Sequence, residues 1–175
     1  MPVTEFVAFK LKAPHNLNDE DTRSNFQKIS SWQSDWSKYP LTFYNAVDDP
    51  AIVYLVSGWK DVEDHMKWIG SEKNQILLQI FQPILSIIDF AHIDVDFRLI
   101  PSDTELLVYL KDTAKDEKEV YTAGLDMQTK EVELWSGQGK VIDGEGVYHF
   151  KALKNLPESS ISPDQPWKFI RRIYL

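Results

Sequence analysis

The sequence contains no cysteine among its 175 residues. This absence excludes disulfide scaffolds, thiolate zinc sites, iron–sulfur clusters and a cysteine nucleophile. No stretch approaches the roughly 20 consecutive apolar residues that a membrane-spanning helix requires. The sequence therefore favours neither a metal centre built on thiolates nor a place in a membrane.

The chain has no cluster of basic residues: its 19 Lys and Arg, against 27 Asp and Glu, are dispersed apart from Arg171 and Arg172. The formal net charge is −8 and the isoelectric point is about 5.0. Because nucleic acid carries dense negative charge, an acidic chain without a basic stripe is not expected to bind it. The first ten residues lack the basic and long apolar segments of a secretion signal, so we expect a soluble, cytoplasmic protein.

Hydrophobic residues make up 43% of the chain and aromatic residues 13%, which is typical of an ordered globular protein with a sizeable core. In the first half, periods of two and of three to four residues predict the order strand, helix, strand, strand, helix, strand. The predicted ranges are strand 5–11, helix 19–39, strands 41–47 and 51–57, helix 61–88 and strand 90–97. This helical pattern is expected to pause at Gly70 and Ser71 and to resume with Ser71 as the cap of a second segment, and Pro83 predicts a kink or a break.

This order is the split βαβ arrangement called ferredoxin-like, so the predicted fold class is α+β, with residues 1–100 forming one domain. Residues 101–175 form a β-rich region with predicted strands at 104–110, 132–136, 140–143, 147–153 and 167–175. Residues 120–133 fit either a helix or a strand, and 155–166 is a predicted loop. The open face of the first sheet needs a cover, which either a second subunit or this region could supply. The region is accordingly either a degenerate second repeat or an extension.

The strand that ends in Gly58 and Trp59, the turn that follows, and His65 in the next helix resemble the antibiotic biosynthesis monooxygenase family, especially its fungal members. The run Ser71-Glu-Lys-Asn-Gln75 adds to the resemblance, which covers roughly residues 3–98. The resemblance implies a dimeric α+β barrel, in which two ferredoxin-like units pack sheet against sheet. It also implies either a homodimer or internal pairing of the two halves.

The best understood members of that family oxidise polycyclic phenols without metal or flavin, so the resemblance implies no cofactor. They use a tryptophan at the end of the third strand, which Trp59 matches. Their tyrosine six residues later is replaced here by His65, and their asparagine four residues before the tryptophan is replaced by Leu55. Related barrels cyclise polyketides, carry out eliminations or break down haem, and some have no known activity.

Two histidines are candidate acid–base residues, because a neutral imidazole can deprotonate a phenol or an α-carbon. His65 lies one turn into a helix, and His92 shares a strand face with Asp94 and Asp96, where Asp94 could orient it. A surface position for His65, a solvated face for His92 and a purely structural role for Trp59 remain open alternatives. We predict His65, His92 and Trp59 as catalytic residues and Phe43, Tyr54 and Trp68 as substrate-binding residues.

No His-x-His or His-Glu-x-x-His pair is present, so we predict no metal site. The leading hypothesis is an enzyme for a small aromatic or polyketide-like substrate, either a cofactor-free monooxygenase or a cyclase. The alternative is a non-catalytic ligand-binding or assembly protein. A third hypothesis, a haem-degrading relative with His65 as the axial ligand, also remains open.

Overall fold

The computed structural model describes residues 2–113, 133–155 and 166–175. The first half contains β1 (Val3–Leu11), α1 (Glu20–Ser37), β2 (Leu41–Ala46), β3 (Ile52–Trp59), α2 (Val62–Ile69), α3 (Glu72–Phe81), β4 (Leu85–Ile93) and the short 3-10 helix η1 (Phe97–Leu99). The second half contains β5 (Leu106–Asp112), β6 (Glu133–Lys140), β7 (Val147–Leu153) and β8 (Lys168–Ile173). The predictions for residues 120–132 and 156–165 lie outside the described residues.

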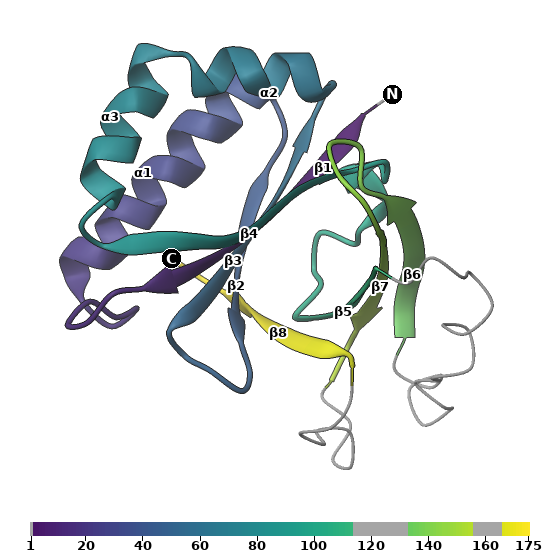
Figure 1. Ribbon diagram of the computed structural model, residues 1–175. Helices are drawn as coiled ribbons and strands as arrows, with labels where there is room; N and C mark the ends of the chain where they lie inside the picture. Colours follow the sequence, from purple (N-terminus) through teal and green to yellow (C-terminus); the bar gives the residue numbers. More distant parts are fainter. Residues whose placement is uncertain (1, 114–132, 156–165) are drawn as a thin grey trace.

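Within the described residues, eight strands form one antiparallel sheet in the order β4-β1-β3-β2-β8-β5-β7-β6. The helices cover one face of β4-β1-β3-β2, and the sheet curls so that the second half faces the other side (Figure 1). Each half places its own fourth, first, third and second strands in that order. None of the helices in the described ranges has both the length and the apolar character needed to cross a membrane.

Side-chain caps determine where α2 and α3 begin. The side chain of Asp61 accepts a hydrogen bond from the backbone N–H of Asp64 at 2.8 Å, and α2 begins at the next residue. Ser71 accepts one from the N–H of Asn74 at 3.2 Å, and α3 begins immediately after it. Both starts are as the sequence predicts.

The second predicted helix ends earlier in the structure than the sequence predicts. Residues 84–88 were expected to be helical, but α3 ends at Phe81 and β4 begins at Leu85. Pro83 lies between the two elements and has no backbone N–H to continue a helix. The apolar run after it, rich in isoleucine, fits a strand as well as a helix.

Alternation along the strands divides the buried residues into two cores. Val7, Phe9 and Leu55 face the helices, where they join one buried cluster. Phe6 and Tyr54 face the opposite side, where they join a second cluster that includes residues of the C-terminal strands. The open face of the first sheet is therefore covered by the second half of the same chain.

The turn after β6 lies against the end of β4. The backbone N–H of Asp94 donates to the carbonyl of Lys140 at 3.0 Å, and the N–H of Ile142 donates to the carbonyl of His92 at 2.8 Å. Gly139 permits this approach, because a Cβ there would lie 2.5 Å from a methyl carbon of Val95. These contacts fix the turn, residues 141–146, beside His92.

Candidate functional site

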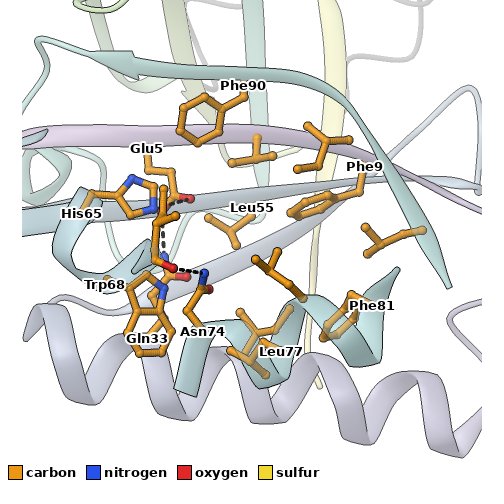
Figure 2. Close-up of a pocket in the computed structure, with 16 residues that line it drawn as sticks. Glu5, Phe9, Gln33, Leu55, His65, Trp68, Asn74, Leu77, Phe81 and Phe90 are labelled. Carbon is orange, nitrogen blue, oxygen red and sulfur yellow. Dashed lines mark hydrogen bonds and ion pairs between the residues drawn. The ribbon is translucent and has the colours of Figure 1, made fainter. Parts of the chain in front are cut away.

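A cavity of about 260 Å³ lies between the helices and the first sheet (Figure 2). Its wall is mostly apolar and comes from β1, β3, β4 and all three helices. The lining residues include Val7, Phe9, Leu55, Trp68, Leu77, Phe81 and Phe90. Glu5, Gln33, His65 and Asn74 bring polar groups to the same wall. An apolar cavity with few convergent polar groups is the usual form of a small-molecule site.

The polar end of the cavity is built around Glu5. This residue is 4% exposed and shares the helix-facing side of β1 with Val3 and Val7. Its Oε2 accepts a hydrogen bond from Gln33 Nε2 at 2.7 Å and another from the indole Nε1 of Trp59 at 2.8 Å. Gln33 lies on the buried face of α1 and Trp59 ends β3, so three elements meet at one carboxyl group.

Burial controls the charge of this carboxyl. Removal from water raises the pKa of Glu5 from 4.5 to about 7, against the lowering effect of the hydrogen bonds from Trp59 and Gln33. Glu5 therefore exchanges its proton near neutral pH. That is the range in which a carboxylate acts as a general base.

Two histidines connect Glu5 to the protein surface. Oε1 of Glu5 lies 3.5 Å from Nε2 of His65, and Nδ1 of His65 lies 2.6 Å from Nε2 of His92. Nδ1 of His92 lies 2.7 Å from Oδ2 of Asp143, whose Oδ1 also accepts from the backbone N–H of His92 at 3.1 Å. We call these four residues, Glu5, His65, His92 and Asp143, the carboxyl–imidazole chain.

His65, next to Glu5, and Asp143, at the outer end, differ in their surroundings. His65 is 3% exposed and stacks on Trp59 with ring centroids 4.3 Å apart, and burial together with neighbouring His92 lowers its pKa to about 3. The Asp143 side chain is 35% exposed. Burial raises the pKa of the Asp143 carboxyl, but hydrogen bonds from His92 outweigh that effect and leave it below its usual value.

These hydrogen bonds require one arrangement of protons when both rings are neutral. Asp143 is an acceptor, so His92 carries its proton on Nδ1 and accepts at Nε2. His65 then carries its proton on Nδ1 and directs the lone pair of Nε2 at Glu5. A protonated Glu5 would place its acidic Oε1 3.5 Å from that lone pair, a longer contact than the other links, while its Oε2 accepts from Gln33 and Trp59.

Four of the six predicted site residues lie together. His65 and Trp68 line the cavity, while Trp59 and His92 lie behind the wall and hold its polar groups. Two predicted substrate-binding residues do not line this cavity. Phe43 packs on Phe26, with ring centroids 4.9 Å apart.

Tyr54 faces the other side of the sheet, because it alternates with Val53 and Leu55 along β3. Its hydroxyl oxygen lies 3.1 Å from that of Tyr109. The predicted partner of His92 is also corrected: Asp94 accepts from the backbone N–H of Lys140 at 2.5 Å, and Asp143 takes the place at His92.

Sequence reasoning missed Glu5, Gln33 and Asp143. A signal for Glu5 was present, because it is an acidic residue within a strand whose neighbours are apolar, and such a position is buried only with partners. Gln33 falls within the predicted helix 19–39, four residues after buried Ile29, so the helical period was a signal for its burial. Nothing in the sequence marks Asp143, which lies 51 residues from His92 in a turn.

The haem hypothesis does not fit this arrangement. An axial ligand needs an imidazole nitrogen that is free to reach iron. In His65, Nδ1 contacts His92 and Nε2 faces Glu5. Across residues 2–113, 133–155 and 166–175, no group of three His, Asp or Glu side chains is arranged to hold a metal ion.

No protein family model matches this chain, and no curated protein matches its sequence. Solved structures match it over nearly its whole length. A Fusobacterium nucleatum protein, provisionally named a monooxygenase, superposes with a TM-score of 0.65 at 12% identity, over 99% of this chain and 93% of its own. A similarly named Lactobacillus acidophilus protein gives a TM-score of 0.58 at 13% identity, over 98% and 93% of the two chains.

A provisionally named chlorite dismutase gives a TM-score of 0.59 at 13% identity, over 99% of this chain and 95% of its own. At such identities the likeness concerns the fold and not the chemistry. The chain therefore has the α+β fold with a curled antiparallel sheet that these monooxygenase-like and chlorite dismutase-like structures share.

Proposed function

We propose that this protein is an enzyme that removes a proton from a small aromatic or polyketide-like substrate in the cavity, with Glu5 as the general base. The observation that carries the proposal is a buried carboxyl group at the end of an apolar cavity, with a pKa near neutrality. This assignment moves the acid–base role expected for His65 to Glu5. His65 has a strongly lowered pKa, and both of its ring nitrogens are directed at protein groups.

The apolar wall favours a substrate that is mostly hydrocarbon and carries one acidic C–H or O–H group. Burying the substrate in this cavity excludes water, which strengthens the interaction between the carboxylate and the acidic proton. Phe9, Trp68 and Phe90 supply aromatic surface along the wall. Glu5 and His65 lie together at one end, so the acidic group of the substrate would be directed there.

Deprotonation leaves an enolate or phenolate, which has two routes forward without a cofactor. It can react with dioxygen, which accepts the electrons, places one oxygen atom in the product and releases the other as water. Alternatively, its carbon can attack a carbonyl group of the same molecule and close a ring. The resemblance to the antibiotic biosynthesis monooxygenases and the fold shared with provisionally named monooxygenases favour the first route.

The proposal is tested by turnover of anthrone-like and polyketone-like compounds, followed by absorbance and oxygen uptake. Because a general base contributes about 100-fold or more to rate, Glu5→Gln should lower kcat by about that factor and leave substrate Kd little changed. Glu63→Gln is the matched control, because Glu63 lies on the exposed face of α2 and pairs with Lys67. Equal turnover in wild type and Glu5→Gln would reject Glu5 as the base.

The alternative is a ligand-binding protein without catalytic activity. The cavity itself would serve that function, and the buried hydrogen bonds of Glu5 would then be structural. Tight binding of the same compounds, with no consumption of compound or oxygen, would favour this alternative.

We also infer that residues 101–175 form a second, degenerate copy of the first half, paired with it inside one chain. The equivalent strand order of the two halves supports this inference. So does the buried cluster in which Phe6 and Tyr54 meet Tyr148 and Phe150. A homodimer in solution and a cytoplasmic location stay predictions. Sedimentation analysis of the full chain tests the first, and fractionation of cells that express it tests the second.

A further inference from the structure

The carboxyl–imidazole chain reaches from the cavity to the surface through side chains alone. Its inner end is the buried Glu5, and its outer end is Asp143, whose side chain is 35% exposed. The two rings between them are 3% and 1% exposed. A general base that only takes a proton from the substrate does not need side chains that lead from it to the surface. The row of side chains from Glu5 to Asp143 therefore needs an explanation other than the protonation of Glu5 alone.

We propose that Glu5, His65, His92 and Asp143 form a reversible proton relay, which holds a proton taken from the ligand on His92 and later returns it to Glu5. This inference rests on the proposed role of Glu5 as the base in the cavity. It assigns His92 and Asp143 as positioning residues, because neither lines the cavity.

The proton shift balances without any added reactant. Oε1 of Glu5 gives its proton to Nε2 of His65, while Nδ1 of His65 gives its proton to Nε2 of His92. Glu5 is then a carboxylate again, His65 is neutral with its proton on Nε2, and His92 is an imidazolium beside the Asp143 carboxylate. The reverse shift restores the acid form of Glu5, which can protonate an intermediate of the reaction.

The surroundings of each ring fit this division of roles. His65 lies among Trp59 and the apolar wall, where burial disfavours a positive charge, so it transfers a proton without keeping it. His92 has a carboxylate 2.7 Å from Nδ1 and a second contact through its backbone N–H. Asp143 thus takes Nδ1–H of His92 as a hydrogen bond and leaves Nε2 of that ring as the nitrogen that can receive a proton from His65.

The groups that face Glu5 come from every element packed against it. They are Gln33 of α1, Trp59 of β3 and His65 of α2. His92 and Ser57 are opposite Glu5 in the pairings of β1 with β4 and with β3. Gln33, Trp59 and Ser57 are neutral groups, so among these neighbours the two imidazoles are the proton acceptors.

The test uses the full chain without ligand, labelled so that nuclear magnetic resonance reports the Glu5 carboxyl and the ring nitrogens of each histidine. As the pH is lowered through about 7, the proton taken up in the wild type should appear at Glu5 and His92 together. In Asp143→Asn the fraction of this proton that is found on His92 should fall at least tenfold, so that the proton is found on Glu5 alone. Glu145→Gln, in the same turn, is the matched control and should behave as the wild type.

Amide spectra establish that each variant is folded, and His65→Gln provides a second interruption of the relay at its middle. Wild-type protein in which Glu5 titrates while the His92 ring stays neutral would overturn the relay. So would an Asp143→Asn protein that titrates as Glu145→Gln does. If turnover is lost in Glu5→Gln but not in Asp143→Asn, the proposed function stands and the relay is rejected. If Glu5 and His92 take up the proton together but no compound is turned over, the relay stands and the proposed function is rejected.

Discussion

Replacing Glu5 with glutamine gives the sharpest physical test of the site, because it needs no substrate. Glutamine has the shape of a protonated glutamate. Its carbonyl oxygen can accept from Gln33 and Trp59, and its amide can face Nε2 of His65, which lies 3.5 Å from Oε1 of Glu5. The substitution thus removes the ionisation and keeps the hydrogen bonds.

The pKa of Glu5 determines how stability should change with pH. The unfolded chain loses the proton of Glu5 near pH 4.5, whereas burial makes the folded protein keep it until about pH 7. The stability that this group contributes is fully present below pH 4.5 and is lost as the pH rises through 7. A pKa difference of this size corresponds to about 3 kcal/mol of unfolding free energy.

Urea unfolding followed by tryptophan fluorescence measures the effect at a series of pH values. Wild type and Glu5→Gln should have similar unfolding free energies at about pH 4, and the variant should be more stable by about 3 kcal/mol at about pH 8. Glu63→Gln should differ little from wild type throughout, because its ion pair is exposed. If the difference between wild type and Glu5→Gln does not change with pH, Glu5 does not have the raised pKa on which the proposed chemistry depends.

Substitutions at three other positions test the surrounding features. Burial and neighbouring His92 lower the pKa of His65 to about 3, so this ring should contribute a loss of up to about 5 kcal/mol as the pH falls from 6.5 towards 3. The difference in unfolding free energy between wild type and His65→Gln in acid urea titrations should change by that amount over this range. Val7→Phe should fill part of the cavity and weaken naphthol binding at least tenfold by calorimetry, whereas Tyr54→Phe, on the other face of the sheet, should leave binding unchanged. Gly139→Ala should destabilise the protein by about 1–3 kcal/mol in thermal unfolding, because the added Cβ would lie 2.5 Å from a methyl carbon of Val95. Gly144→Ala should have a smaller effect, because the added Cβ would lie 3.3 Å from the nearest atom, a methyl carbon of Val141.

Short-range patterns predicted most of the fold of the first half. The loose alternation in β1, the β-branched and aromatic run in β3, and the cap residues Asp61 and Ser71 all involve residues close in sequence. The boundary between α3 and β4 was predicted wrongly, because a short isoleucine-rich run satisfies both periodicities. How the second half packs on the first could not be predicted, since strand pairing between distant segments leaves no local signal.

In the candidate site, too, the residues close together in sequence were predicted and the distant ones were not. Trp59, His65 and Trp68 are near neighbours in sequence, and a strand end followed by a helix start was enough to place them together. The groups that give the site its chemistry come from farther away: Glu5 lies 54 residues before Trp59, and Asp143 lies 51 residues after His92. Tyr54, predicted as a substrate-binding residue, lies on the face of the sheet away from the cavity, because it alternates with Leu55 along β3.

The position of His92 explains why the second half of the chain matters for a site that lies in the first. Its ring is on the helix-facing side of β4, opposite Glu5, while Ala91 and Ile93 on either side belong to the core shared with the second half. At this residue the turn after β6 also meets the end of β4 through backbone hydrogen bonds. The second half therefore does more than cover the open face of the sheet. It delivers Asp143, whose carboxylate binds both the ring and the backbone N–H of His92, so the proton relay proposed for the helix-covered half requires the β-rich half to be folded.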